Sequence, residues 1–243
     1  MKTFGLLGKS IDYSFSPSYF NQKFETLNLE DYKYELIDVD DLDGIRDHIQ
    51  SRGISGFNVT KPYKIEIMSL VDELDESAKQ IGAVNCVKIV NDKWIGYNTD
   101  GFGFHQMIKP FLEQTHERAF ILGKGGASNA VYHILEKLGV QCFFVRREAE
   151  LPNELEYSQL NDMMMDQIQV IVNCTPVGTF PNIEDKPNIP YNHLNENHFL
   201  IDLVYNPKET AFLKEGKQRG AMVLNGYDML VWQAEKSWTI WQE

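Results

Sequence analysis

The sequence predicts an α/β protein built from two successive series of strands and helices. Short apolar runs typical of strands alternate along the chain with segments of helical periodicity, which is the pattern of parallel sheets covered by helices. Midway along the chain, the glycine-rich segment ILGKGGASNAV begins in one strand-like run and opens a helix. These observations indicate two α/β domains.

The first series alternates strands with helices and ends in a hairpin. Ser16 and Pro17 predict the start of its first helix, with the serine as N-cap and the proline at the first helical position, and this helix ends near Thr26. Two apolar runs separated by a short polar turn predict the hairpin. The other elements are strands over 2–8, 32–39 and 54–59, a helix over 42–51, hairpin strands over 83–90 and 94–98, and a helix over 100–112.

The second series repeats the alternation and closes with an amphipathic helix. On that helix Met229, Gln233 and Ser237 share one face because they are spaced four residues apart. The elements are strands over 118–123, 140–145, 168–174 and 198–204, helices over 127–138 and 227–241, and a proline-containing loop over 179–192.

Composition excludes several classes of partner. The 243 residues carry a formal net charge of −12, which argues against nucleic acid because its binding needs a basic face. The N-terminus lacks the pattern of a signal peptide, and no apolar run approaches membrane-spanning length. Three dispersed cysteines, Cys86, Cys142 and Cys174, indicate buried thiols in a reducing cytoplasm. No Cys/His grouping suggests a metal, so we expect a cytoplasmic protein with a small-molecule substrate, no membrane partner and no metal.

The glycine-rich segment has the spacing of a dinucleotide-binding turn, G-x-G-x-x-G/A, between a strand and a helix. Gly123 would allow the tight turn, and Gly125 the close approach of backbone to a pyrophosphate. Gly126 and Ala127 would open a helix whose first N–H groups face the phosphates, with the small Ser128 at the sixth position. The segment therefore predicts a Rossmann-type domain. The alternative is a plain connection between a strand and a helix.

Arg146 and Arg147 follow the next predicted strand, where an NAD-preferring site usually places an acidic residue for the ribose 2′-hydroxyl. Two guanidinium groups suit a 2′-phosphate instead, so we predict NADP (NADPH) as the cofactor. Glu148 follows directly and weakens this electrostatic argument. The alternative is a solvated basic pair at the end of a strand.

Two segments, GFNVTKPYK and GYNTDGFGF, place small polar side chains beside strand-like runs. The first delivers Lys64 after the turn made by Pro62, and the second delivers Asp100. A lysine and a carboxylate around a hydrogen-bonding pocket can exchange a proton with a substrate hydroxyl. Beside a dinucleotide site, this pair predicts hydride transfer to or from the carbon of that hydroxyl. The alternatives are a strand with a capped turn and an ion pair that only joins two segments.

Eight segments in register make the chain resemble the shikimate dehydrogenase family over nearly its whole length. They are YSFSPSYFN, GFNVTKPYK, GAVNCV, GYNTDGFGF, LGKGGA, NCTPVG, DLVYNPKETAFL and GYDMLVWQAEKSW. The resemblance implies reversible reduction of 3-dehydroshikimate to shikimate with NADPH, in chorismate and aromatic amino acid biosynthesis. It also implies a substrate domain and a Rossmann domain with the active site in the cleft between them.

Carried over by motif, the resemblance implies a division of the chain and a set of site residues. Because Gln233 would reach the substrate, the C-terminal helix would complete a substrate-binding domain of residues 1–100 and 225–243, leaving residues 101–224 as the NADP-binding domain. The implied residues are Lys64 and Asp100 as catalytic pair, Ser14, Ser16, Thr60, Asn85, Tyr205 and Gln233 on the substrate, and Thr175, Leu203 and Gly226 with the glycine-rich turn on the cofactor.

The polar residues suit this substrate on chemical grounds. Shikimate is a ring with hydroxyls and one carboxylate, so its site should be rich in neutral donors and acceptors. Ser14, Ser16 and Tyr205 can donate to the carboxylate, and the positive end of the first helix points the same way. Other polar groups can read the ring hydroxyls. The site would reject analogues that lack these hydroxyls, because such analogues leave those groups unpaired. Those groups are Asn58, Thr60, Asn85 and Gln233.

Some positions depart from the family pattern, which puts the details of the cofactor site in doubt but not the class of reaction. Phe20 stands where histidine is common, Cys86 where threonine is common, Arg146 where asparagine precedes the arginine, and Thr179-Phe180 where methionine is frequent. The rival functions are a quinate/shikimate dehydrogenase accepting NAD, a reductase of other small hydroxy acids or aminated analogues, and a non-catalytic nucleotide-binding regulator. A monomer and a homodimer both remain open.

Overall fold

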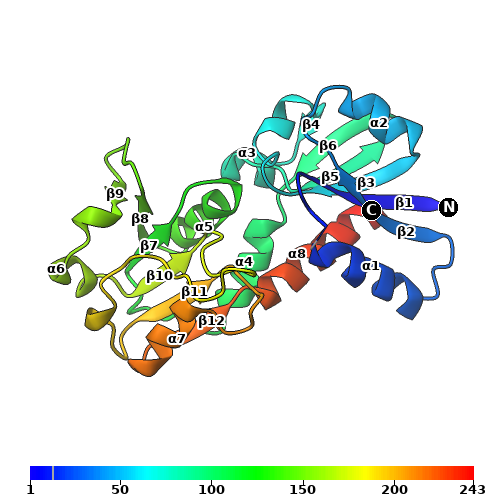
Figure 1. Cartoon of the computed structure of the whole chain (residues 1–243). Coiled ribbons are helices and arrows are strands. Elements are labelled where there is room, and N and C mark those ends of the chain that lie inside the picture. The colour runs from blue at the N-terminus through cyan, green and yellow to red at the C-terminus, as the bar shows by residue number, and fades with distance from the viewer. Residues whose placement is uncertain (13) are drawn as a thin grey trace. The chain divides into compact units, whose positions relative to one another are not determined.

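The computed structural model describes residues 1–12 and 14–243, which divide into two compact units (Figure 1). The first unit comprises residues 1–99 and 234–243, and the second comprises residues 100–233. The last helix, α8 (Tyr227–Gln242), contributes its first turns to the second unit and the rest to the first. The predicted division differs because it grouped residues 225–233 with the first domain, whereas Met229 packs in the core of the second unit.

The first unit contains a mixed sheet whose order, within the described residues, is β2-β1-β3-β5-β6-β4. β1 pairs in parallel with β2 and β3, whereas β5 runs antiparallel to β3 and β6. The strands are β1 (Lys2–Gly8), β2 (Tyr32–Asp38), β3 (Ile54–Val59), β4 (Glu73–Leu74), β5 (Cys86–Val90) and β6 (Lys93–Tyr97), and the α-helices are α1 (Phe15–Thr26), α2 (Ile45–Ser51) and α3 (Glu76–Ile81).

Helices cover both faces of this sheet, because side chains alternate along its strands. Phe4 and Leu6 of β1 lie in one cluster with residues of α1 and α8, where the rings of Phe4 and Trp241 stack at 4.7 Å. Leu7 lies in the opposite cluster with Ile45 of α2 and Ala78 of α3. The sheet is therefore the middle layer of the first unit.

Two helices of the first unit begin at residues other than those predicted. α1 begins at Phe15 with Ser14 as N-cap, so the predicted N-cap, Ser16, lies inside the first turn. Pro17 is tolerated there because the first N–H groups of a helix have no intrahelical acceptor. α2 begins after Gly44, whose φ of +67° is left-handed and excludes the preceding residues from the helix.

The predicted hairpin is confirmed, with a shorter turn than expected. β5 and β6 pair antiparallel, and Val90 is the register partner of Lys93, so only Asn91 and Asp92 form the turn. Both have positive φ, 51° and 62°, which is the conformation of the two-residue hairpin turns that favour Asn and Asp.

The second unit contains a parallel sheet whose order, in the described part of the chain, is β12-β11-β10-β7-β8-β9. The predicted α/β class is thus confirmed for both units. The strands are β7 (Arg118–Leu122), β8 (Gln141–Arg146), β9 (Glu154–Glu156), β10 (Val170–Asn173), β11 (Phe199–Asp202) and β12 (Met222–Asn225), and the helices are α4 (Asp100–Ile108), α5 (Gly126–Lys137), α6 (Asp162–Met165) and α7 (Ala211–Gln218).

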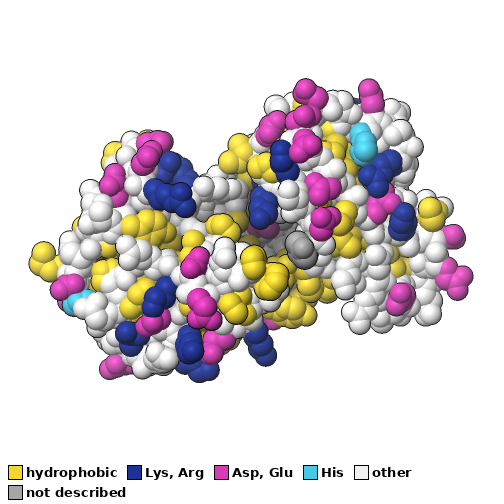
Figure 2. Space-filling model, viewed as in Figure 1, with side chains coloured by type: hydrophobic (Ala, Val, Ile, Leu, Met, Phe, Trp, Pro, Cys, Tyr) yellow, Lys and Arg dark blue, Asp and Glu magenta, His cyan; other side chains and the backbone are white. Residues whose placement is uncertain are grey.

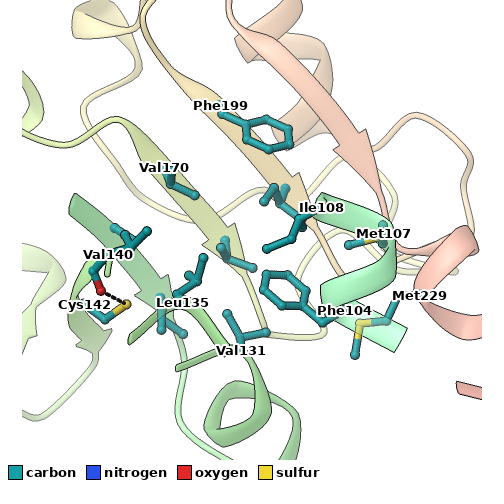
Figure 3. Packing of buried hydrophobic residues seen from close by; sticks show 14 of the residues in the cluster. Phe104, Met107, Ile108, Val131, Leu135, Val140, Cys142, Val170, Phe199 and Met229 are labelled. Atoms are coloured by element: carbon teal, nitrogen blue, oxygen red, sulfur yellow. Dashed lines mark hydrogen bonds between the residues drawn. The ribbon is translucent and has the colours of Figure 1, made fainter. Parts of the chain in front are cut away.

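The core of the second unit is split by this sheet into two clusters. On one face Phe104 of α4, Leu135 of α5 and Met229 of α8 pack together against the strands (Figure 3). On the other face Met165 of α6 and Phe212 of α7 pack with alternate residues of the same strands. A parallel sheet buried on both faces is the arrangement expected of a doubly wound nucleotide-binding fold.

Several short elements were absent from the prediction, and one predicted helix is shorter. The strands β4, β9 and β12 are too short to show a period. α7 had a readable start signal, since Thr210 is its N-cap and accepts the N–H of Leu213 at 3.3 Å. α4 ends at Ile108 and not at Leu112. The unpredicted elements are β4, β9, β12, α3, α6, α7 and three short 3₁₀ turns.

Candidate functional site

The predicted catalytic and substrate residues of the first unit gather at one edge of its sheet. β1 and β3 are parallel, so the loops that follow them leave the same edge. β5 is antiparallel to β3 and begins at this edge, where the N–H of Val59 donates to the carbonyl of Asn85 at 2.9 Å. A Cβ added to Gly8 would lie 2.6 Å from Cγ2 of Thr60, so the two loops touch. The edge therefore collects Ser14, Ser16, Asn58, Thr60, Lys64 and Asn85.

The turn that presents Lys64 is fixed by three backbone hydrogen bonds. The N–H of Thr60 donates to the carbonyl of Leu7 at 2.8 Å, and the N–H of Tyr63 donates to the carbonyl of Thr60 at 3.0 Å. The N–H of Val84 donates to the carbonyl of Lys64 itself at 2.7 Å. The half-buried lysine side chain therefore extends from a backbone with little freedom.

Asn58, the next-to-last residue of β3 at this edge, makes three hydrogen bonds within the protein. Its Oδ1 accepts the hydroxyl of Tyr34 at 2.8 Å, and its Nδ2 donates to the carbonyl of Asn85 at 3.1 Å and to Oγ of Ser237 at 2.8 Å. Burial raises the pKa of Tyr34 well above its ordinary value, which keeps it a neutral donor. Both amide hydrogens of Asn58 are committed to the protein, so only the second lone pair of Oδ1 could accept a ligand hydroxyl without replacing one of these bonds.

Asn85 holds the residue that precedes Asp100. Its Oδ1 accepts the N–H of Thr99 at 2.6 Å, and its Nδ2 donates to Oγ1 of Thr99 at 3.0 Å. Oγ1 of Thr99 also lies 3.2 Å from Oγ of Ser237. Asp100, with only 5% of its surface exposed, is the first residue of α4, where the helix dipole favours a carboxylate.

The start of α1 supplies the two predicted serines. The N–H of Ser14 donates to the carbonyl of Ile11 at 3.0 Å, which fixes the approach to the helix. Ser14 is half-buried and Ser16 is buried in the first turn. Because N–H groups of a first helical turn lack intrahelical partners, this end of α1 can hold an anion beside the serine hydroxyls.

Tyr205 and Gln233, the other predicted substrate residues, belong to the second unit. Tyr205 is half-buried in the loop after β11. Gln233 is buried on α8, where its Nε2 donates to the carbonyl of Leu230 at 3.0 Å. The predicted substrate residues therefore come from both units.

The predicted cofactor residues all lie at the carboxyl-terminal edge of the second sheet. This sheet reverses its winding between β7 and β10, which is where such folds bind nucleotides. The residues are Gly123, Gly125, Gly126 and Ala127 after β7, Arg146 and Arg147 at the end of β8, Thr175 after β10, Leu203 after β11 and Gly226 after β12.

The glycine-rich turn has the geometry that a dinucleotide requires. Gly123 has a φ of +91°, and a Cβ there would lie 2.7 Å from Cγ2 of Thr175, so only glycine fits. An added Cβ on Gly125 would meet no atom within 4 Å, so a phosphate can approach this backbone. Oγ of the buried Ser128 accepts the N–H of Gly125 at 2.6 Å and donates to its carbonyl at 2.9 Å. These features fit a pyrophosphate at the start of α5.

Basic side chains gather on the surface of the second unit (Figure 2). Among the basic residues of this unit, Arg146 and Arg147 have different surroundings. Arg146 donates to Glu154 at 3.1 Å and to the exposed Glu150 at 3.3 Å. Lys124 also bonds to Glu154. The bond from Lys124, then those from the N–H of Glu150 and from Arg146, lower the pKa of Glu154 to about 2. Arg147 is exposed. The expectation that both arginines are available to a phosphate therefore has to be narrowed, because Arg146 already neutralises a buried carboxylate.

A buried polar network supports the loops after β10 and β11. Asp202 accepts Nδ2 of Asn173 at 3.0 Å, the N–H of Val204 at 3.0 Å and the hydroxyl of Thr210 at 2.6 Å. Oδ1 of Asn173 in turn accepts the N–H of Thr175 at 3.0 Å and its hydroxyl at 2.6 Å. Burial raises the pKa of Asp202 to about 6. The network sets the positions of loops that contain predicted cofactor residues.

Several of these residues escaped sequence reasoning. Lys124 was visible inside the glycine-rich segment, but its partner Glu154 is distant in sequence and lies on a strand too short to predict. Asn173 and Asp202 each end an apolar strand, which is a readable signal for a polar group at the edge of a parallel sheet. Ser237 gave no signal beyond its helical spacing from Gln233.

The described part of the chain holds neither a cluster of metal-ligating side chains nor a membrane-spanning helix. Among residues 1–12 and 14–243, no group of three or more His, Cys, Asp and Glu side chains could hold a metal ion. No helix in these ranges is both long enough and apolar enough to span a bilayer. Cys86, Cys142 and Cys174 are free thiols.

Comparison with known proteins relates both units to shikimate dehydrogenases. Residues 6–87 match the model of the shikimate dehydrogenase substrate binding domain. The chain is 38% identical to the shikimate dehydrogenase (NADP(+)) of Methanococcus aeolicus over 256 residues, covering 99% of this chain and 91% of the relative.

Solved structures extend the likeness to three dimensions. Shikimate dehydrogenase 1 from Peptoclostridium difficile has a TM-score of 0.87 and 36% identity, covering 100% of this chain and 92% of that one. The Thermus thermophilus shikimate 5-dehydrogenase in complex with NADP(H) and shikimate has a TM-score of 0.85, 30% identity and coverage of 99% and 93%. A quinate dehydrogenase from Corynebacterium glutamicum in complex with NAD has a TM-score of 0.86, 26% identity and coverage of 99% and 93%.

Proposed function

This chain belongs to the shikimate dehydrogenase family, and we propose that it catalyses the reversible reduction of 3-dehydroshikimate to shikimate with NADPH. The observation that carries the proposal is the grouping of polar residues at two sheet edges, one suited to a hydroxylated acid and one to a dinucleotide. The reaction belongs to aromatic amino acid biosynthesis. Free thiols at all three cysteines support a reducing, cytoplasmic setting.

The first unit binds the substrate in this proposal. Ser14 and Ser16, at the start of α1, donate to the substrate carboxylate, assisted by the helix dipole. Thr60 and Asn85 read ring hydroxyls, with Tyr205 and Gln233 as further polar contacts. Asn58 keeps its expected part as a hydroxyl-reading residue through Oδ1, and its bonds to Tyr34, Asn85 and Ser237 also support Asn85.

Lys64 and Asp100 carry the proton chemistry. In the reducing direction the ammonium of Lys64 donates a proton to the substrate oxygen as the carbonyl becomes an alcohol, and its charge stabilises the developing alkoxide. In the oxidising direction the pair accepts the hydroxyl proton. Asp100 begins α4, directly after Thr99, whose N–H is bonded to Asn85. In this proposal its carboxylate orients the lysine or the substrate hydroxyl.

NADPH, when bound, supplies the hydride. The second unit binds it, with Gly125, Gly126 and Ala127 around the pyrophosphate and Arg147 at the ribose 2′-phosphate. The open space at Gly125 and the exposed guanidinium of Arg147 support this assignment. Thr175, Leu203 and Gly226 complete the edge of the cofactor site.

A quinate/shikimate dehydrogenase that uses NAD is the second candidate, favoured by the likeness to the quinate dehydrogenase bound to NAD. The decisive assay records nicotinamide absorbance with purified protein and each pairing of shikimate or quinate with NADP⁺ or NAD⁺. We expect kcat/KM to be highest for shikimate with NADP⁺. A higher kcat/KM for quinate with NAD⁺ would select the second candidate, and no absorbance change with any pairing would refute both and favour a non-catalytic regulator.

A further inference from the structure

Lys124 stands inside the glycine-rich turn, between Gly123 and Gly125, yet its side chain is tied to a different part of the cofactor edge. Its Nζ bonds to Glu154 of β9 and lies 5.8 Å from the ring centre of Phe144 in β8. The lysine therefore leaves the turn after β7 and extends toward the strands β8 and β9.

Glu154 is the group that holds Lys124 there. Its carboxylate is fully buried. It also accepts a hydrogen bond at 3.1 Å from the guanidinium of Arg146, the last residue of β8. It accepts the N–H groups of Glu150 at 2.8 Å and Leu151 at 3.2 Å as well. One buried carboxylate thus joins the glycine-rich turn to the loop after β8.

Through Glu154, the ammonium of Lys124 is held near the end of β8, where the adenosine ribose of a dinucleotide is expected. In nucleotide-binding sheets of this type, the residue at the end of the strand after the glycine-rich turn contacts the 2′ substituent of that ribose. Arg146 ends that strand, and Lys124 shares a carboxylate with it. An ammonium has three N–H donors, of which Glu154 takes one, and the Lys124 side chain is 34% exposed.

We infer that Lys124 is a cofactor-specificity residue that binds the 2′-phosphate of NADP together with Arg147, and that Glu154 positions it. This inference rests on the proposed function, because it names a residue by which the proposed NADP site would distinguish NADP from NAD. Glu154 shares its charge between Lys124 and Arg146, and Arg146 is also paired with Glu150, so the N–H donors that Lys124 has left can bind the phosphate oxygens. Removing Lys124 would leave Glu154 opposed by Arg146 alone, so the loss of a cation would be accompanied by a less neutralised anion.

The test measures nucleotide binding and needs no turnover. Calorimetric titration of the full chain compares adenosine 2′,5′-bisphosphate with adenosine 5′-monophosphate, which differ in the 2′-phosphate alone. Lys124→Met should weaken the bisphosphate about tenfold, the scale of one charge-assisted hydrogen bond partly screened by water, and leave the monophosphate unchanged. Lys124→Arg should restore most of the bisphosphate affinity. Lys137→Met, at the other end of α5, is the matched control and should change neither ligand.

The outcomes separate the inference from the proposed function. Unchanged bisphosphate affinity in Lys124→Met would overturn the inference while leaving the nucleotide site intact. An equal loss for both ligands would also overturn it, because a merely structural lysine would disturb the whole turn. A wild-type protein that binds neither nucleotide would refute the cofactor assignment, and the inference with it. Melting temperatures of all variants check that folding is preserved, and Lys124→Gln provides a second neutral variant if the methionine destabilises the turn.

Discussion

Lys64 is the residue on which the proposed chemistry depends most directly. The hydrogen bonds of Thr60, Tyr63 and Val84 fix its backbone without using its ammonium group. A role in proton transfer and a role in folding therefore predict different results when only the side chain is shortened.

Lys64→Ala should lower kcat by about 10²-fold or more, because a positioned proton donor is lost while binding groups remain. Circular dichroism and shikimate binding should be unchanged. Lys61→Ala is the matched control, because Lys61 lies in the same turn with an exposed side chain, and it should keep near-normal turnover. A Lys64→Ala variant with near-normal kcat would leave Lys64 a structural residue.

Arg146 and Arg147 are expected to have different roles, and replacing each residue alone tests this. Arg147→Ala should reduce the preference for NADPH over NADH about tenfold, since an exposed guanidinium that can bind phosphate is lost. Arg146→Ala should instead lower the melting temperature, because Glu154 would lose one of its two cationic partners. The ratio of kcat/KM for the two cofactors, measured beside thermal unfolding, distinguishes these effects. Identical behaviour of the two variants would contradict the division of roles.

At the scale of elements, the loops after β10 and β11 depend on one buried carboxylate. Asp202 joins Asn173 to Thr210 and so ties together the ends of two strands and the start of α7. Cys174 and Tyr191 are the titratable groups whose charged forms it opposes, and burial raises the pKa of both. Both side chains are therefore uncharged beside this carboxylate at neutral pH.

Asp202 makes stability depend on pH with a predictable sign. Burial raises its folded pKa from 3.8 to about 6, so the folded state binds more protons than the unfolded state between these values. Its favourable contribution is full below pH 4 and is lost as the pH rises through 6. Asp202→Asn should therefore gain stability relative to wild type between pH 4 and 7, by on the order of 3 kcal/mol or less. Urea unfolding at several pH values measures the difference, and parallel curves would contradict the prediction.

At the scale of the whole molecule, one helix serves two cores. The first turns of α8 place Met229 in the core of the second unit, and its last turns place Trp241 in the core of the first. Trp241 stacks on Phe4 and donates its indole N–H to the carbonyl of Val87 at 3.0 Å. The C-terminal residues are therefore part of the hydrophobic core that the N-terminal strand helps to form.

Trp241→Ala should lower the free energy of unfolding of the first unit by about 3–5 kcal/mol, the range for removing a large buried aromatic side chain. Trp232→Ala on the same helix is the control, since 44% of Trp232 is exposed, and it should cost far less. Denaturant unfolding followed by tryptophan fluorescence measures both. NADPH binding should survive in Trp241→Ala, because its ligands lie in the second unit, and equal effects of the two variants would contradict the prediction.

Strand and helix type, the glycine-rich turn and the local presentation of Lys64 follow from the sequence alone. Each depends on residues close together along the chain, such as the apolar runs of β1 and β7 or the positive φ of Gly123. The exact starts of helices were less readable, because the choice between Ser14 and Ser16 as N-cap depends on where the chain leaves β1.

Only the tertiary structure decided which polar groups are committed to the protein and which remain for a ligand. The bonds of Asn58 to Ser237, of Lys124 to Glu154 and of Asn173 to Asp202 join residues far apart in sequence. Such pairings carry no periodic signal, because they arise where separate strands end at the same edge of a sheet. The sequence by itself therefore determined the kind of chemistry, and the packing of distant segments determined which side chains are placed to perform it.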